Sequence, residues 1–223
     1  MVQFSVERTI YMRIGIFGGS FDPVHLGHLL IAMHAWEQLR LDELRMVPAA
    51  QSPLKPIGVH AGTEQRLEML RLAISGTDPL RIDDSELRRG GVSYTVETLA
   101  AIRLAQPAAE LLLIMGADSL ASITRWHQPE RILQLATLAV VRRGGMPAID
   151  YSVLESLANR QQIEHCRDAE LSMPMIELSS SELRQRVAEG RTIRFRTPRA
   201  VEAYIAAHGL YQATTPNAPV NDP

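Results

Sequence analysis

The feature that most constrains the fold of this chain is the alternation of short apolar runs with longer segments of helical spacing. The clearest apolar run, residues 111–115, is Leu-Leu-Leu-Ile-Met and ends at Gly116. Such a run is typical of a strand buried on both faces, as in the centre of a parallel sheet. Similar runs predict strands at residues 13–18, 44–47, 80–82, 138–141 and 175–178. Apolar residues three and four positions apart predict helices at residues 26–39, 64–74, 95–104, 129–135, 151–159, 181–189 and 198–208.

Because strands and helices alternate, the sequence predicts an α/β fold in which helices cover both faces of a parallel sheet. In such folds ligands bind at the carboxyl ends of the strands, close to the point where the strand order reverses. We expect a single domain at residues 13–211, since no linker or internal repeat interrupts the pattern. Residues 1–12 would be an N-terminal extension, and residues 212–223, rich in Pro, Asn and Thr, predict a disordered tail.

Charge and cysteine content narrow the class of protein. The net charge of −2 argues against a general nucleic-acid binder, which is usually basic. The single cysteine, Cys166, cannot form an intrachain disulfide and suits a reducing compartment. No stretch has the apolar length of a membrane span, and Glu7 and Arg8 interrupt the N-terminus where a signal peptide would be apolar. We therefore expect a cytoplasmic protein with neither a nucleic-acid nor a membrane partner.

The segment between the first strand and the first helix carries the strongest chemical signal. It is Gly-Gly-Ser-Phe-Asp-Pro-Val-His-Leu-Gly-His, residues 18–28. Gly18 and Gly19 allow backbone geometry that other residues resist, and they let a ligand approach the main chain. The dipeptide Asp22-Pro23 predicts the entry into the helix, with the aspartate as its cap.

Two histidines lie on one face at the start of that helix. His25 and His28 are three residues apart, so both side chains point the same way. The helix N-terminus adds unpaired N–H groups and a partial positive charge. Together these groups predict a phosphate site, and Gly27 leaves room for a flat base against the helix. Two incidental histidines are the alternative, which the agreement of glycines, histidine pair and position disfavours.

A second segment, residues 178–184, predicts another helix start. Ser179 and Glu182 have the spacing of a capping box. Arg184 would lie in the first turns, within reach of an anion near the helix N-terminus. Alone this signal is weak, because a capped helix with an exposed arginine is common.

These two segments resemble the motifs of the nucleotidyltransferase superfamily. Residues 18–28 resemble its GxFxPxHxGH signature, and residues 178–184 resemble its SSTxxR motif, with Ser181 in place of the usual threonine. The resemblance implies a Rossmann-like fold with a small C-terminal helical part. It also implies that His25, His28 and Arg184 act on the phosphates of ATP. The implied ATP-binding residues are Gly18, Gly19, Ser20, Phe21, Gly27, Ser179, Ser180 and Ser181.

The long loop at residues 49–62 contributes one further implied catalytic residue. Pro53-Leu-Lys55 resembles the superfamily's Pro-Pro-His-Lys stretch. Lys55 would supply a mobile positive charge to the triphosphate. Leu54 replaces the usual histidine, so that histidine's role has no counterpart here. Taken without the resemblance, Lys55 fits a solvated loop lysine equally well.

Weaker features resemble the nicotinate-mononucleotide branch of the superfamily. They are Ser93-Tyr-Thr95, Gly116-Ala-Asp118, Trp126 and residues 140–144. The resemblance implies that the helix start after Tyr94 and the indole hold the pyridine ring and its carboxylate. Asp118, after a buried strand, would hold ribose hydroxyls. The implied mononucleotide-binding residues are Tyr94, Thr95, Gly116, Asp118 and Trp126.

The resemblance thus implies an adenylyltransferase of NAD biosynthesis that joins nicotinate mononucleotide to the AMP of ATP. Mg²⁺ would arrive with the ATP, and no cluster predicts a metal site of the protein's own. Phosphopantetheine adenylyltransferase is an alternative, disfavoured by residues 93–95, Trp126 and the longer chain. A catalytically silent nucleotide sensor is another, disfavoured because His25, His28, Arg184 and Lys55 are all present. A homo-oligomer is left open.

Overall fold

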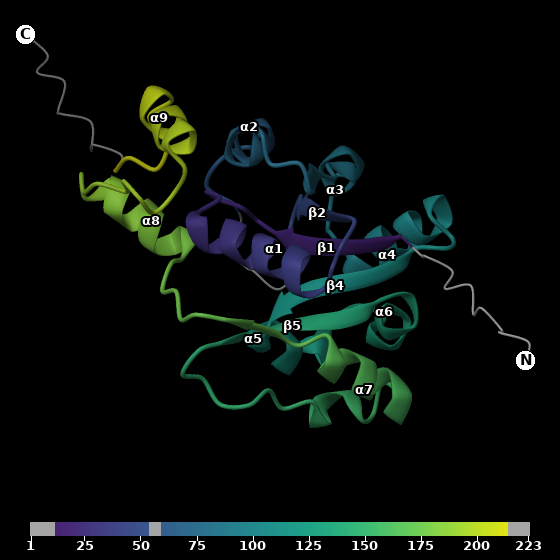
Figure 1. Ribbon diagram of the computed structural model, residues 1–223. Helices are drawn as coiled ribbons and strands as arrows, with labels where there is room; N and C mark the ends of the chain where they lie inside the picture. Colours follow the sequence, from purple (N-terminus) through teal and green to yellow (C-terminus); the bar gives the residue numbers. More distant parts are fainter. Residues whose placement is uncertain (1–11, 54–58, 214–223) are drawn as a thin grey trace, which may run out of the picture.

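A computed structural model describes residues 12–53 and 59–213 of the 223-residue chain. Within these ranges the core is one parallel sheet in the order β3-β2-β1-β4-β5-β6 (Figure 1). Every neighbouring pair of strands is parallel. This confirms the α/β fold predicted from the alternation. The strands are β1 (Arg13–Gly19), β2 (Glu43–Pro48), β3 (Leu80–Ile82), β4 (Glu110–Gly116), β5 (Thr137–Arg143) and β6 (Leu171–Met173).

Helices cover both faces of the sheet because side chains alternate along each strand. On β1, Ile14 and Ile16 pack into the hydrophobic cluster that includes residues of α4, α6 and α7, whereas Phe17 packs into the cluster that includes residues of α1, α2 and α9. The helices are α1 (Leu26–Gln38), α2 (Thr63–Ile74), α3 (Ser85–Arg89), α4 (Thr95–Ala105), α5 (Ala117–Ala121), α6 (Pro129–Leu135), α7 (Arg160–Asp168), α8 (Ser180–Ala188) and α9 (Arg199–Ala207), with 3-10 turns at Ile123–Arg125 and Ser152–Leu154.

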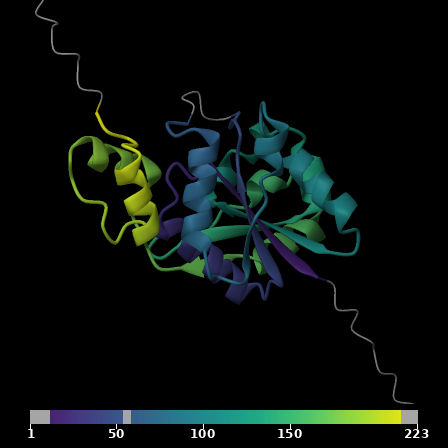
Figure 2. The same ribbon diagram turned by 90° about the horizontal axis from the view of Figure 1, so that it is seen from above.

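The strand order reverses between β1 and β4. The chain runs from β1 to β2 and β3 on one side, then returns to place β4 against the other edge of β1. Residues 18–28 run from the end of β1 to the start of α1, and residues 116–118 run from the end of β4 into α5, so both of these predicted substrate segments lie at this reversal. Helices α8 and α9 form the small C-terminal part, in which α9 packs beside α2 (Figure 2).

Two predicted elements are wrong. Residues 151–159 hold a 3-10 turn, and the helix begins at Arg160, where the Asn159 side chain accepts a hydrogen bond from the Gln162 amide at 2.9 Å. Residues 175–178 are not a strand, because the edge strand β6 ends at Met173. Pro174 follows it and has no N–H with which to continue the ladder.

The predicted extension and tail lie almost wholly outside the described residues, so the domain boundaries stay a prediction. Over the part of the chain that the structure covers, no helix combines the length and apolarity needed to cross a membrane.

Gly15 lies at the most crowded point of β1 and gives a test of the packing. A methyl group there would lie 2.5 Å from Cδ1 of Leu41 and 3.0 Å from Cδ1 of Ile114, both buried side chains. We expect Gly15→Ala to lower the free energy of unfolding by about 1–3 kcal/mol, measured by urea denaturation. At Gly18 on the same strand a methyl group would meet nothing within 4 Å. Gly18→Ala should therefore stay within about 0.5 kcal/mol of the wild type. Equal stability of the two variants would contradict this account of the core.

Candidate active site

The turn after β1 places both predicted histidines at the start of α1. His25 is the N-cap of α1, in an extended conformation, and its backbone N–H donates to Nδ1 of His28 at 3.3 Å. The two imidazole rings are stacked, with centroids 3.7 Å apart and an interplanar angle of 21°. Because Nδ1 of His28 accepts a hydrogen bond, a neutral His28 carries its proton on Nε2. The pair therefore lies at the N-terminus of α1, where the amides of Leu26 and His28 donate to the carbonyls of Arg196 and His25.

His25 is neutral at physiological pH. Burial, reinforced by the nearby Arg143 guanidinium, lowers the pKa of His25 from 6.5 to about 4. The ring is only 5% exposed, and its Nδ1 has no hydrogen-bond partner among the described residues. A neutral His25 can donate or accept hydrogen bonds in this site but carries no positive charge. The nearby positive charge belongs to Arg143, at the end of β5. The sequence analysis gave Arg143 no role.

The glycines of the turn leave space and do not supply unusual backbone angles. Neither Gly18 nor Gly19 has a positive φ, contrary to the reason for which they were predicted. A methyl group at Gly18 would point into open space, whereas one at Gly19 would lie 3.0 Å from the Phe21 ring. At Gly27 a methyl group would lie 3.0 Å from Nδ1 of His25. The space beside Gly27 is therefore used by the imidazole, and its contact with a base stays a prediction.

Phe21 is the strained residue of the turn. Its φ is +47°, and its ring is fully buried, with an edge-on contact to His28 at a centroid distance of 5.0 Å. The buried ring leaves only the main chain of Phe21 available to a ligand, and its contact with ATP stays a prediction. Ser20, beside it, is half-buried.

Side chains of the C-terminal helical part donate hydrogen bonds to the backbone carbonyls of the turn. Three consecutive carbonyls of the turn each accept one hydrogen bond from this part of the chain: Arg184 Nη1 to Asp22 at 2.7 Å, Ser180 Oγ to Pro23 at 2.8 Å, and Thr197 Oγ1 to Val24 at 2.8 Å. The turn itself is irregular, so these donors satisfy backbone groups that no helix or strand would pair. Residues 18–28 and 180–197 are therefore one structural unit.

The predicted start of α8 is confirmed. Ser179 is its N-cap, and its hydroxyl accepts a hydrogen bond from the Glu182 amide at 3.1 Å. Arg184 donates through Nη2 to Ser181 Oγ at 3.2 Å as well as to the Asp22 carbonyl. A guanidinium has five N–H groups, so these bonds orient it without using all its donors.

The predicted mononucleotide-binding residues come from the start of α4 and from the end of β4 onward. Tyr94 is the N-cap of α4 and Thr95 its first residue. The Tyr94 ring contacts the ring of His127 at a centroid distance of 4.5 Å. Trp126, next to His127, packs against the same hydrophobic cluster as Tyr94. The structure thus brings together two segments about thirty residues apart in sequence, and His127 is a residue that the sequence analysis missed.

Two other predicted residues flank this segment. Gly116 ends β4, with open space where a side chain would be, and Asp118 is exposed in the first turn of α5. The indole Nε1 of Trp126 is buried and has no hydrogen-bond partner among the described residues. Leu54 and Lys55 lie outside those residues, so the structure says nothing of their place.

Asp22 differs from its predicted role as a helix cap. It does not cap α1, whose N-cap is His25. Its carboxylate instead accepts hydrogen bonds from the amides of His60 and Ala61, at 2.6 and 3.1 Å, and from the Tyr211 hydroxyl at 2.7 Å. The carboxylate therefore connects three segments that are distant in sequence.

Arg66 is a fully buried cation beside this carboxylate. Its Nη1 donates to the carbonyls of Ser20 and Ala49, both at 2.8 Å. Burial lowers the pKa of Arg66, and the Asp22 carboxylate opposes that shift. An arginine four residues before Leu70, on the apolar side of a predicted helix, is a signal that could have revealed it.

The chain matches known proteins over nearly their whole length. Residues 16–186 match the family model described as cytidylyltransferase-like. A probable nicotinate-nucleotide adenylyltransferase from Rhodopirellula baltica is 53% identical over 89% of this chain and 93% of its own length. Another from Thermus thermophilus is 43% identical over 90% of this chain and 100% of its own length.

A solved structure shares the fold. Plasmodium falciparum nicotinic acid mononucleotide adenylyltransferase, in complex with NaAD, superposes with a TM-score of 0.71, covering 90% of this chain and 98% of its own. Its sequence identity is 19%, so this similarity concerns the architecture. The family match and the close relatives show that the chain belongs to the cytidylyltransferase-like family and, within it, to the nicotinate-nucleotide adenylyltransferases.

Proposed function

We propose that this protein transfers the AMP moiety of ATP to nicotinate mononucleotide, giving nicotinate adenine dinucleotide and pyrophosphate in NAD biosynthesis. The observation that carries the proposal is the stacked pair His25–His28 at the N-terminus of α1, at the reversal of strand order. Such a site suits polyphosphate, and Tyr94 at the start of α4 packs against the same hydrophobic cluster as Trp126, which follows β4. The close relatives carry the same activity in their names.

The reaction needs charge neutralisation more than proton transfer. A phosphate monoester has a second pKa of about 6, so the mononucleotide phosphate attacks largely as a dianion without a general base. Its oxygen forms a bond to the α-phosphorus of ATP. The bond from that phosphorus to the bridging oxygen breaks, and pyrophosphate leaves with the electron pair. The protein must hold two anions in line and stabilise the charge on the leaving group.

The described side chains suit that work. Neutral His25 and the Nε2–H of His28 would donate to phosphate oxygens beside the amides of α1. Arg184, oriented by Asp22 and Ser181, would bind the triphosphate, and Lys55 is proposed to add a further charge. The hydroxyl-rich start of α8, residues 179–181, would complete the ATP site.

Mg²⁺ is proposed to enter on the nucleotide. In the ranges that the structure covers, no group of three or more His, Cys, Asp or Glu side chains is placed to hold a metal ion. The phosphates of ATP and water are the oxygen ligands that Mg²⁺ prefers. When bound, the ion neutralises charge on the triphosphate.

The mononucleotide would bind where the start of α4 meets the segment that follows β4. The backbone N–H groups at the start of α4, near Tyr94 and Thr95, would donate to the ring carboxylate, and the Trp126 indole would stack on the ring. Asp118 would hold ribose hydroxyls. A cytoplasmic location, the absence of nucleic-acid and membrane partners, and a homo-oligomer stay predictions.

Replacing either histidine tests the phosphate site. We expect His28→Ala and His25→Ala to lower kcat by a factor of about 10² or more, with a smaller change in KM, because they stabilise charge in the transition state. The measurement is pyrophosphate release from ATP and nicotinate mononucleotide. His34→Ala is the matched control, since His34 lies on the same helix and pairs with Gln38. Near wild-type turnover by both active-site variants would refute the mechanism.

The neutral state of His25 predicts a pH dependence of stability. The pKa of His25 is about 4 in the folded chain, below its ordinary 6.5, so between these values the unfolded state binds more protons. The free energy of unfolding should therefore fall as the pH is lowered from about 6.5 to 4, by roughly 3 kcal/mol from this residue. His25→Gln should flatten the dependence in urea denaturation series. An unchanged slope would show that His25 is not the group responsible.

The choice of mononucleotide tests the roles proposed for Tyr94, Thr95 and Trp126. Nicotinate carries a carboxylate, whereas the amide of nicotinamide brings a donor that backbone N–H groups cannot accept, at a cost of about 1–3 kcal/mol. We expect kcat/KM to favour nicotinate mononucleotide at least about tenfold. Trp126→Ala should reduce use of both substrates together, because stacking does not distinguish them. Equal rates in parallel assays would remove the nicotinate assignment and leave the adenylyltransferase assignment standing.

A further inference from the structure

We propose that the hydroxyl of Tyr211 is a positioning group for the ATP site and acts through Asp22. The inference rests on the proposed function, in which residues 18–28 bind the triphosphate. Tyr211 lies after α9, 189 residues along the chain from Asp22, and donates to Asp22 Oδ1 at 2.7 Å. Its contribution to the site is thus invisible in any local motif.

Asp22 links the Tyr211 contact to the conformation of the turn. It is 2% exposed, and its carboxylate accepts from the amides of His60 and Ala61 as well as from Tyr211. Its own carbonyl accepts from Arg184 at 2.7 Å. The side chain and the carbonyl of one residue therefore fix the orientation of the peptide that separates the strained Phe21 from the start of α1.

The charge of Asp22 makes the hydroxyl important. A buried carboxylate beside a polyphosphate site repels the substrate unless its charge is compensated. Arg66 is fully buried, and its positive charge interacts electrostatically with the Asp22 carboxylate. Since burial, together with the Asp22 hydrogen bond, raises the pKa of Tyr211 far above physiological pH, its hydroxyl remains a donor in every assay. The hydroxyl and Arg66 together compensate the carboxylate.

The backbone of Tyr211 adopts a strained conformation. Its φ is +62°, a left-handed conformation that bulky residues rarely adopt. Such strain persists where surrounding contacts over-determine it, and it clusters at functional sites. The ring packs against the hydrophobic cluster of α1, α2 and α9, which directs the hydroxyl inward.

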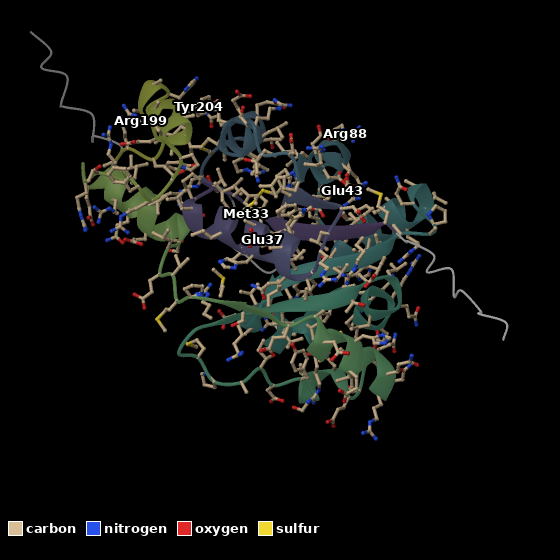
Figure 3. All side chains as sticks on the ribbon, in the orientation of Figure 1. Met33, Glu37, Glu43, Arg88, Arg199 and Tyr204 are labelled. Carbon is tan, nitrogen blue, oxygen red and sulfur yellow. The ribbon has the colours of Figure 1, made fainter. Side chains whose placement is uncertain are left out.

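Tyr211→Phe removes the hydroxyl and keeps the ring. We expect kcat to fall about tenfold, because a small displacement of phosphate-binding groups weakens the transition state most. KM for the mononucleotide should stay within about twofold, since the residues proposed to bind that substrate, Tyr94, Thr95 and Trp126, belong to other segments of the chain. Tyr204→Phe is the matched control. Tyr204 lies on α9 (Figure 3), and its ring stacks on His208 at 4.0 Å. A purely structural role for Tyr211 would lower the melting temperature and leave kcat unchanged, and that result would overturn the proposal.

Hydrogen exchange shows whether the effect passes through Asp22. The amides of His60 and Ala61 should exchange faster in Tyr211→Phe and at the wild-type rate in Tyr204→Phe. Asp22→Ala, which removes the acceptor of the Tyr211 hydroxyl, should lower kcat, and adding Tyr211→Phe to it should lower kcat no further, because both changes break the same contact. Multiplying effects would overturn the proposal. Unchanged exchange at the amides of His60 and Ala61 would also overturn it. This exchange measurement requires only that the Tyr211→Phe variant folds.

A separate readout distinguishes this inference from the proposed function. Calorimetry of ATP binding to the wild type and Tyr211→Phe requires no turnover, and we expect affinity to weaken about threefold or more. If the wild type releases no pyrophosphate but its ATP affinity depends on Tyr211, the function is wrong and the positioning role stands. Equal ATP affinity together with equal kcat would refute the positioning role alone.

Discussion

The site depends on how an irregular turn is kept in one shape. Between β1 and α1 the chain makes no ladder or helical bonds, yet it must present two histidines and several amides in fixed positions. Hydrogen bonds to the carbonyls of residues 22–24 come from the C-terminal helical part, and bonds to the Asp22 carboxylate come from the segment before α2 and from Tyr211. The sheet supplies the location of the site, whereas these bonds supply its geometry.

The protonation state of His25 follows from its burial in this site. Because His25 is buried beside Arg143, its pKa is about 4, and positive charge for the phosphates comes from arginines and from the start of α1. A neutral imidazole donates to an anion without the desolvation cost of a buried cation. The stacked rings are closely spaced, and two protonated imidazoles at 3.7 Å would repel each other.

Much of this arrangement is predictable from sequence, and the limits have physical reasons. The strands, most of the helices and the histidine pair follow from apolar periodicity and short motifs, because they depend on residues close in the chain. The roles of Asp22, Arg66 and Tyr211 depend on contacts between residues up to 189 positions apart, which no periodicity reveals. Residues 175–178 look like a strand, but Pro174 and the edge position of β6 prevent pairing.

The long reach of these bonds also has a consequence for the order in which the protein is made. The turn after β1 is among the first parts of the domain to leave the ribosome, whereas the groups that hold it, from Ser180 to Tyr211, are among the last. Contacts that close so large a loop form late in folding as well. A nascent chain can therefore pair β1 with β2 well before it can hold a nucleotide. Competence to bind ATP therefore requires that synthesis has passed Tyr211.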